Sequence, residues 1–208
     1  MLKAVASLAT VLAVILYPLA MYFGLSHWGI GKVSGLLAVT AILSFGLRWL
    51  SWRHHFVGQL LLPATLVLSC SALGWFVKDP RFLLCLPTLI NAALFVSFGQ
   101  SLWTAMPLVE RFARLSHADL GAAEVRYCRQ VTKLWCGFFV FNGATAAALA
   151  WAAPLAWWAT YTGLLAYLLM GLLMAGEYVV RKQRFGRWNS SLPDRFLATL
   201  LAAPRGQR

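Results

Sequence analysis

Charged residues are scarce in this chain of 208 residues, and acidic residues are the scarcest. Only 12% of the sequence is charged, with 6 Asp and Glu against 18 Lys and Arg, whereas 61% is hydrophobic. A soluble domain carries about 25% charged residues. A chain as apolar as this one would have too little polar surface to cover it in water. This composition excludes an ordinary soluble domain and indicates a protein that folds in lipid.

Motifs for several kinds of chemistry are also missing. The sequence has no Cys-x-x-Cys pair, no His-Glu-x-x-His, no Gly-rich phosphate loop and no Gly-x-Ser-x-Gly elbow. Its four cysteines are therefore expected to be free thiols that pack as small hydrophobes, rather than a disulfide framework. We predict no catalytic residue, no metal and no cofactor from these patterns.

Six long apolar runs are present, each close to the roughly 20 residues that a helix needs to cross a bilayer. They cover residues 4–25, 30–47, 57–77, 82–106, 131–152 and 155–180. Backbone groups in lipid must satisfy their own hydrogen bonds, so each run is expected to be a helix. The predicted fold is an all-α transmembrane bundle over residues 1–187, followed by a cytoplasmic amphipathic tail over 188–208.

The basic residues predict the orientation of this bundle. Six crossings place 15 of the 18 Lys and Arg on the side of Met1, the exceptions being Lys32, Lys78 and Arg81. Cytoplasmic loops carry such an excess, so both termini are predicted to be cytoplasmic in a bacterial inner membrane. Topology also accounts for the net charge of +12, and no nucleic-acid partner is expected.

The loops on the two sides differ in length. Residues 26–29, 78–81 and 153–154 form very short outer loops, which predict three tight antiparallel hairpins. The inner loop, 107–130, is longer. It contains apolar residues at helical spacing, which predict a short amphipathic helix in the membrane interface, and a second helix expected to begin near Asp119.

Four polar residues within the apolar runs are candidate site residues. Asn91 and Asn142 lie deepest, Thr88 shares a face with Asn91, and Glu177 precedes Arg181 by four residues, the favourable order for a helical ion pair. A buried amide in lipid commonly bonds to another helix. These residues are therefore either helix–helix contacts or the lining of a ligand groove.

The inner loop carries a second candidate surface, a cytoplasmic interface for a partner. The candidate residues of this interface are Glu110, Arg111, Arg114, Arg126 and Arg129. Basic interfacial segments attract anionic phospholipid, so membrane lipids are the expected partners.

The C-terminal half carries a family resemblance. Its motifs are Pro-Leu-Val-Glu-Arg-Phe-Ala-Arg-Leu from Pro107, Arg126-Tyr127-Cys128-Arg129, Leu134-Trp135-Cys136-x-Phe138-Phe139-x-Phe141-Asn142-Gly143, Tyr161-Thr162-Gly163-Leu164-Leu165-Ala166-Tyr167 and Gly176-Glu177-Tyr178. They resemble an uncharacterised family of bacterial inner-membrane proteins associated with aryl polyene (xanthomonadin-type) pigment clusters. More distantly, Pro-Leu-Val-x-Arg followed by a Trp-x-x-Phe-Phe span is similar to the intracellular septation protein A family. The second resemblance implies a role in envelope organisation.

Three functions fit these observations. The first is a non-enzymatic component that binds, presents or helps translocate a lipid-like product such as an aryl polyene lipid. The second is a scaffold in envelope organisation or division, acting as a homo-oligomer or with an envelope protein. The third is a small membrane-embedded transferase, for which Glu110, His117, Asp119 and Glu124 are the candidate residues.

Overall fold

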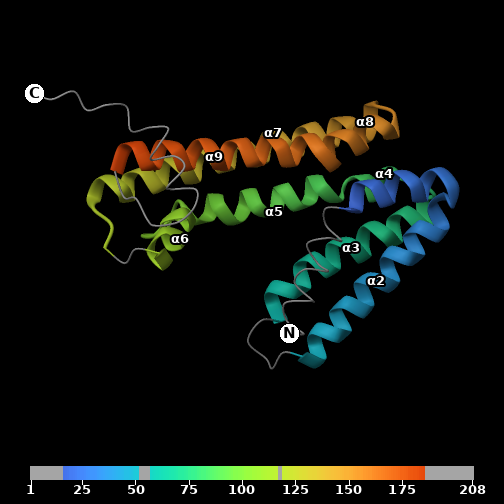
Figure 1. Ribbon diagram of the computed structural model, residues 1–208. Coiled ribbons are helices and arrows are strands. Elements are labelled where there is room, and N and C mark those ends of the chain that lie inside the picture. Colours follow the sequence, from blue (N-terminus) through green and yellow to red (C-terminus); the bar gives the residue numbers. More distant parts are fainter. Residues whose placement is uncertain (1–15, 52–56, 117–118, 186–208) are drawn as a thin grey trace, which may run out of the picture.

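The described part of the chain is entirely helical. The computed structural model describes the backbone of residues 16–51, 57–116 and 119–185, and the side chains of these residues except 43–51, 57–66 and 116. Within these ranges there is no strand, which confirms the all-α prediction for this part (Figure 1). The beginning of the expected span 4–25, and the expected tail 188–208, lie outside the described residues.

The helices follow one another with short connections. After a helix over 16–27 come α2 (Gly29–Ser51), α3 (Val57–Val77), α4 (Arg81–Leu84), α5 (Leu86–Ser101), α6 (Leu108–Ser116), α7 (Ala122–Ala152), α8 (Leu155–Thr160), the π-helix η1 (Tyr161–Leu165) and α9 (Ala166–Phe185). The turn before α2 places Gly29 at a φ of 73°, a conformation that glycine adopts at little cost.

Three of these helical segments are long and apolar enough to cross a membrane. They are Arg81–Ser101, Ala122–Ala152 and Leu155–Phe185, while Gly29–Ile42 and Val67–Val77 are shorter apolar stretches among the described side chains. Large apolar side chains point outward along them, such as Leu172 in α9, which is 68% exposed. The chain is therefore compatible with a membrane protein.

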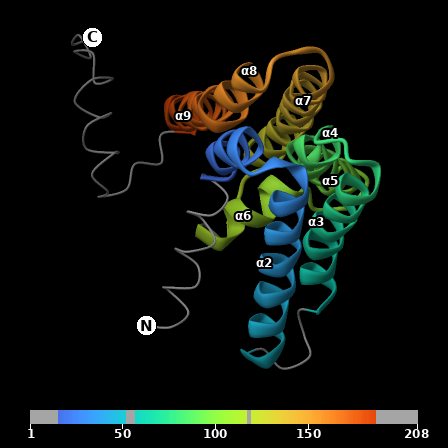
Figure 2. The same cartoon turned by 90° about the vertical axis from the view of Figure 1, so that its right-hand side faces the viewer.

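The helices form two groups. α5 and α7 run side by side, α9 follows a similar direction and contacts α7, and α2 and α3 form a pair inclined to them (Figure 1). Figure 2 looks along α7 and α9 and shows α2 and α3 lengthwise. The closest packing is between α5 and α7 and between α2 and α3.

Several helix boundaries among the described residues differ from the expected ones, such as the end of α2 at Ser51 rather than at 47. The expected span 82–106 ends at Ser101, where the amides of the next three residues bond to carbonyls three residues back, and Pro107 disfavours helix at Met106 further on. α7 begins at Ala122 rather than near Asp119, because the Glu124 carboxylate accepts a 2.8 Å hydrogen bond from the Gly121 amide. α9 continues to Phe185, where its basic residues suit a helix C-terminus.

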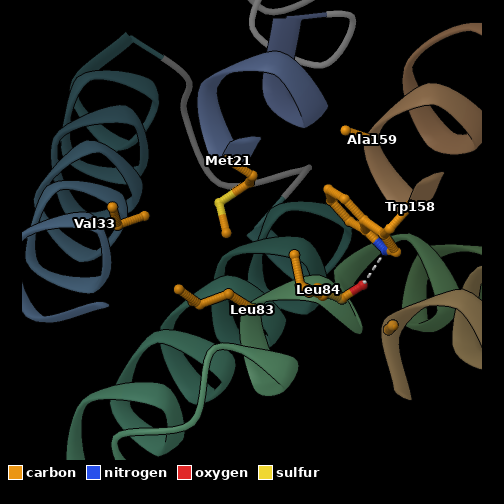
Figure 3. Close-up of a cluster of buried hydrophobic side chains, with 7 residues drawn as sticks. Met21, Val33, Leu83, Leu84, Trp158 and Ala159 are labelled. Carbon is orange, nitrogen blue, oxygen red and sulfur yellow. Dashed lines mark hydrogen bonds between the residues drawn. The ribbon is translucent and has the colours of Figure 1, made fainter. Parts of the chain in front are cut away.

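A break between α4 and α5, which the apolar pattern did not predict, lies at the centre of the core. Pro87 lacks the N–H that would bond to the Leu83 carbonyl, and the Tyr17 hydroxyl donates to this carbonyl instead, at 2.7 Å. The indole Nε1 of the fully buried Trp158 donates to the Leu84 carbonyl at 3.1 Å (Figure 3). Both bonds satisfy backbone acceptors that an unbroken helix would have paired internally.

The core cluster surrounds this break and joins all three helical hairpins. Its buried side chains are Met21, Val33, Leu83, Leu84, Ala150, Trp158 and Ala159 (Figure 3). They come from the helix over 16–27 and from α2, α4, α7 and α8. The hairpins are thus tied together at the end of the molecule that carries the short loops.

Candidate functional site

A chain of polar side chains joins α5, α7 and η1. The Tyr161 hydroxyl donates to Asn142 Oδ1 at 2.9 Å, and Asn142 Nδ2 donates to Asn91 Oδ1 at 3.1 Å. Asn91 Nδ2 donates in turn to the Pro87 carbonyl at 2.8 Å. We call Tyr161, Asn142 and Asn91 the amide chain. All its bonds run in one direction, from the hydroxyl on η1 to a backbone carbonyl on α5.

Three of the four polar residues singled out in the sequence therefore come together. The Thr88 hydroxyl lies beside the amide chain and donates to the Gly143 carbonyl at 3.3 Å. The fourth, Glu177, lies away from them on α9, where its Oε1 is 3.5 Å from Arg181 Nε in the expected ion pair. Tyr161 was not anticipated, because no sequence pattern places a π-helix residue opposite a distant asparagine.

The amide chain lies ten residues from one end of two candidate spans. Asn91 follows Arg81 by ten residues, and Asn142 precedes Ala152 by ten. At about 1.5 Å per residue, both amides are about 15 Å from the same end of the bundle. The hydrocarbon core of a bilayer is about 30 Å thick, so this depth corresponds to its middle.

Gly143 is the reason that the two asparagines can meet. A Cβ at this position would stand 3.0 Å from the Cβ of Asn91 and 3.7 Å from the Thr88 carbonyl oxygen. Small residues allow helix backbones to approach closely in lipid. The glycine therefore sets the spacing of α5 and α7 at which the amides form a direct hydrogen bond.

The amide chain retains hydrogen-bonding capacity. A primary amide has two N–H donors, and the described contacts use one on Asn91 and one on Asn142. Asn91 is 7% exposed, whereas Asn142 is half-buried and reaches the surface of the α5–α7 pair. Asn142 can therefore offer a donor to a ligand that lies along this pair.

An aromatic stripe continues from the amide chain along the same helices. It consists of Phe98 on α5 and Trp135, Phe138 and Phe139 on α7, with ring centroids 5.1 Å apart for Phe98–Phe139 and 5.6 Å for Trp135–Phe139. Phe98 follows Asn91 by seven residues and Trp135 precedes Asn142 by seven, two helical turns in each case. The stripe therefore runs about 10 Å from the amides toward the end of α5.

The expected charged interface divides into two parts. Arg129 donates to the Leu102 carbonyl at 2.7 Å and Arg111 to the Met106 carbonyl at 3.0 Å, so both hold the turn between α5 and α6. Glu110 is buried and its Oε1 accepts from Arg114 Nη2 at 2.7 Å. Arg126 is exposed on α7.

Two of the residues weighed for transferase chemistry have structural contacts. The Glu110 carboxylate pairs with Arg114 and that of Glu124 caps α7, while His117 lies outside the described residues. Among the described residues, no group of three or more His, Cys, Asp or Glu could hold a metal ion. Cys70, Cys85, Cys128 and Cys136 are free thiols, and all but Cys85 are buried.

Comparisons with protein-family models, with curated proteins and with solved structures find no match to this chain. Its function is therefore inferred from the contacts and distances given above.

Proposed function

We propose that this chain is a non-enzymatic inner-membrane protein that binds, presents or helps translocate a lipid-like product, such as an aryl polyene lipid. The observation that carries the proposal is the continuity of the amide chain with the aromatic stripe on the α5–α7 pair. Ligand sites are mostly apolar and contain a few placed polar groups that orient the ligand. Here the polar group is Asn142 and the apolar surface is aromatic.

The chemistry of this surface favours a flat, conjugated chain with an oxygen-bearing group. Rings such as Trp135 and Phe138, both half-buried, offer faces and edges to another π-system. The second N–H of Asn142 would donate to a carbonyl or hydroxyl oxygen of the ligand. The choice of an aryl polyene among such lipids comes from the resemblance of the C-terminal half to the pigment-cluster family.

The proposed topology has six spans with both termini in the cytoplasm. It is supported by the three candidate spans, by the apolar helical stretches in α2 and α3, and by the bias of 15 of the 18 Lys and Arg toward one side. In this orientation α6 and the start of α7 are cytoplasmic, and the core cluster lies at the outer end.

A binding experiment tests the site directly. The purified chain in lipid nanodiscs is titrated with a conjugated tetraene fatty acid, and energy transfer from tryptophan to the tetraene is measured. Asn142→Ala should weaken binding about 5-fold, the equivalent of one hydrogen bond of about 1 kcal/mol. Phe141→Leu is the matched control, because Phe141 is 56% exposed on the same helix and lies outside the stripe. Equal affinity for all three proteins would overturn this site.

Deletion of the gene in its native host separates the three functions. Pigment and lipids are measured in separated inner and outer membranes. A product trapped in the inner membrane supports presentation or transport. Loss of the product with accumulation of a precursor supports a transferase instead, and unchanged lipids with altered division support a scaffold.

A further inference from the structure

Helix α6 has its apolar face turned away from the protein. At about 100° per residue, Leu108, Phe112 and Leu115 share one face, and Glu110 and Ala113 lie on the other. Leu115 is 83% exposed and Phe112 is 58% exposed, whereas Glu110 is 3% exposed. A helix on the surface of a water-soluble protein has the opposite arrangement, with its apolar stripe toward the core.

This orientation is held by contacts at the beginning of the helix. Pro107, just before α6, is fully buried, and the Leu108 amide donates to the Ser101 hydroxyl at 3.0 Å. On the side of α6 that faces the protein, Arg114 donates from both Nε and Nη2 to Oε1 of the buried Glu110, which compensates the charge of this carboxylate within the helix. Rolling the helix to bury its apolar stripe would strain the Leu108–Ser101 bond and turn the Glu110 carboxylate out of its buried position, so the outward face is part of the fold.

The position of α6 indicates what its outward face meets. α6 lies at the end of α5 and beside the beginning of α7, where two candidate membrane spans end (Figure 1). The preceding turn adds Trp103, which is 86% exposed, and Met106, which is 38% exposed. Arg111 lies at the edge of the apolar face and is exposed. Tryptophan and arginine beside an apolar stripe are typical of the boundary between lipid headgroups and acyl chains.

We propose that α6 and Trp103 form a surface that inserts into the phospholipid monolayer at this end of the bundle. Phe112 and Leu115 would enter the acyl region by about 5–10 Å, and Arg111 beside them would face anionic headgroups. A protein partner fits less well, because four apolar side chains cover much less than the roughly 800 Å² per partner of a stable interface. This proposal does not depend on the lipid-like ligand proposed above.

Spin labels test the insertion in the full-length chain. Single cysteines at Phe112, Leu115 and, as a control, Arg126 are labelled with a nitroxide in nanodiscs containing anionic phospholipid. The unmodified chain, labelled in the same way, gives the background from its native thiols. Collisions with dissolved oxygen and with a water-soluble nickel complex are then compared. The thermal midpoint of each variant shows whether its fold is retained.

Labels at 112 and 115 should collide more often with oxygen than with the nickel complex, and the label at 126 should collide more often with the nickel complex. If the labels at 112 and 115 collide with the nickel complex as often as the label at 126 does, the apolar face is exposed to water and the proposal is overturned. Dipolar broadening between labels on different copies would place a second copy of the chain there and overturn it as well. Protection from both reagents would show that another protein segment covers α6, with the same consequence.

Discussion

Replacing Gly143 with alanine is expected to push α5 away from α7 at the point where the two asparagines meet. The new Cβ would stand 3.0 Å from the Cβ of Asn91, an atom that moves only with the backbone of α5. Overpacking of this kind costs about 1–3 kcal/mol. The alanine itself favours helix over glycine by about 1 kcal/mol, so the steric cost must be measured against a control that shares this gain.

Gly137 provides that control. It lies on the same helix, is exposed, and has no atom within 4 Å of a Cβ placed on it. Unfolding of Gly143→Ala and Gly137→Ala in mixed micelles of rising dodecyl sulfate fraction is followed by tryptophan fluorescence. Gly143→Ala should be less stable than Gly137→Ala by about 1–3 kcal/mol, because the helix gain cancels in the comparison. Equal stability of the two variants would refute the close packing of α5 and α7 at Gly143.

Three further predictions concern the core cluster and the turn before α6. Trp158→Phe should lower the free energy of unfolding by about 1–3 kcal/mol, because it leaves a buried carbonyl unpaired, whereas Trp157→Phe at a 67% exposed residue should have little effect. Tyr17→Phe should lower the free energy of unfolding by a similar amount, because it leaves the Leu83 carbonyl unpaired. The loss should be smaller in a Pro87→Ala background, because the alanine has a backbone N–H that can bond to the Leu83 carbonyl. Arg129→Ala should increase the mobility of a nitroxide on α6, measured by its spectral line width, because the turn loses two carbonyl contacts.

Each of these predictions has an outcome that contradicts it. Equal stability of the two tryptophan variants would mean that the indole bond contributes nothing. A cost of Tyr17→Phe that is unchanged by Pro87→Ala would show that the hydroxyl acts other than by pairing the free carbonyl. An unchanged line width in Arg129→Ala would mean that the turn is held by other contacts.

The polar part of the candidate site could be anticipated because lipid restricts the choices of a buried amide. Asn91 and Asn142 are amides in apolar runs with no nearby charge, so each needs a partner on another helix. Thr88 follows from its place one turn before Asn91. The partner of each amide still had to be found in three dimensions, since the sequence does not say which helices are adjacent.

Other features depend on packing that a pattern does not contain. Amphipathicity predicts α6, but the choice of which face contacts the protein depends on the burial of Glu110. Pro87 could have indicated a break, yet proline is tolerated in membrane helices when other groups pair the freed carbonyl. Those groups, Tyr17 and Trp158, are far away in the sequence. Pro107 could have indicated that the helix ends before Met106, but it does not predict the end at Ser101.

The π-helix η1 determines in which direction the side chains of α9 point around the helix axis. A π-turn contains about one residue more than an α-helical turn, and one residue corresponds to a rotation of about 100° about the helix axis. Deleting a single residue within 161–165 would therefore swing the basic end of α9 around the bundle by more than a quarter of a turn. The Tyr127 hydroxyl, which now donates to the Glu177 carbonyl at 3.3 Å, would then face a different side of α9. The extra residue thus acts as an angular offset between the two ends of the last helix, and a change in chain length here would alter which side chains α9 presents to α7.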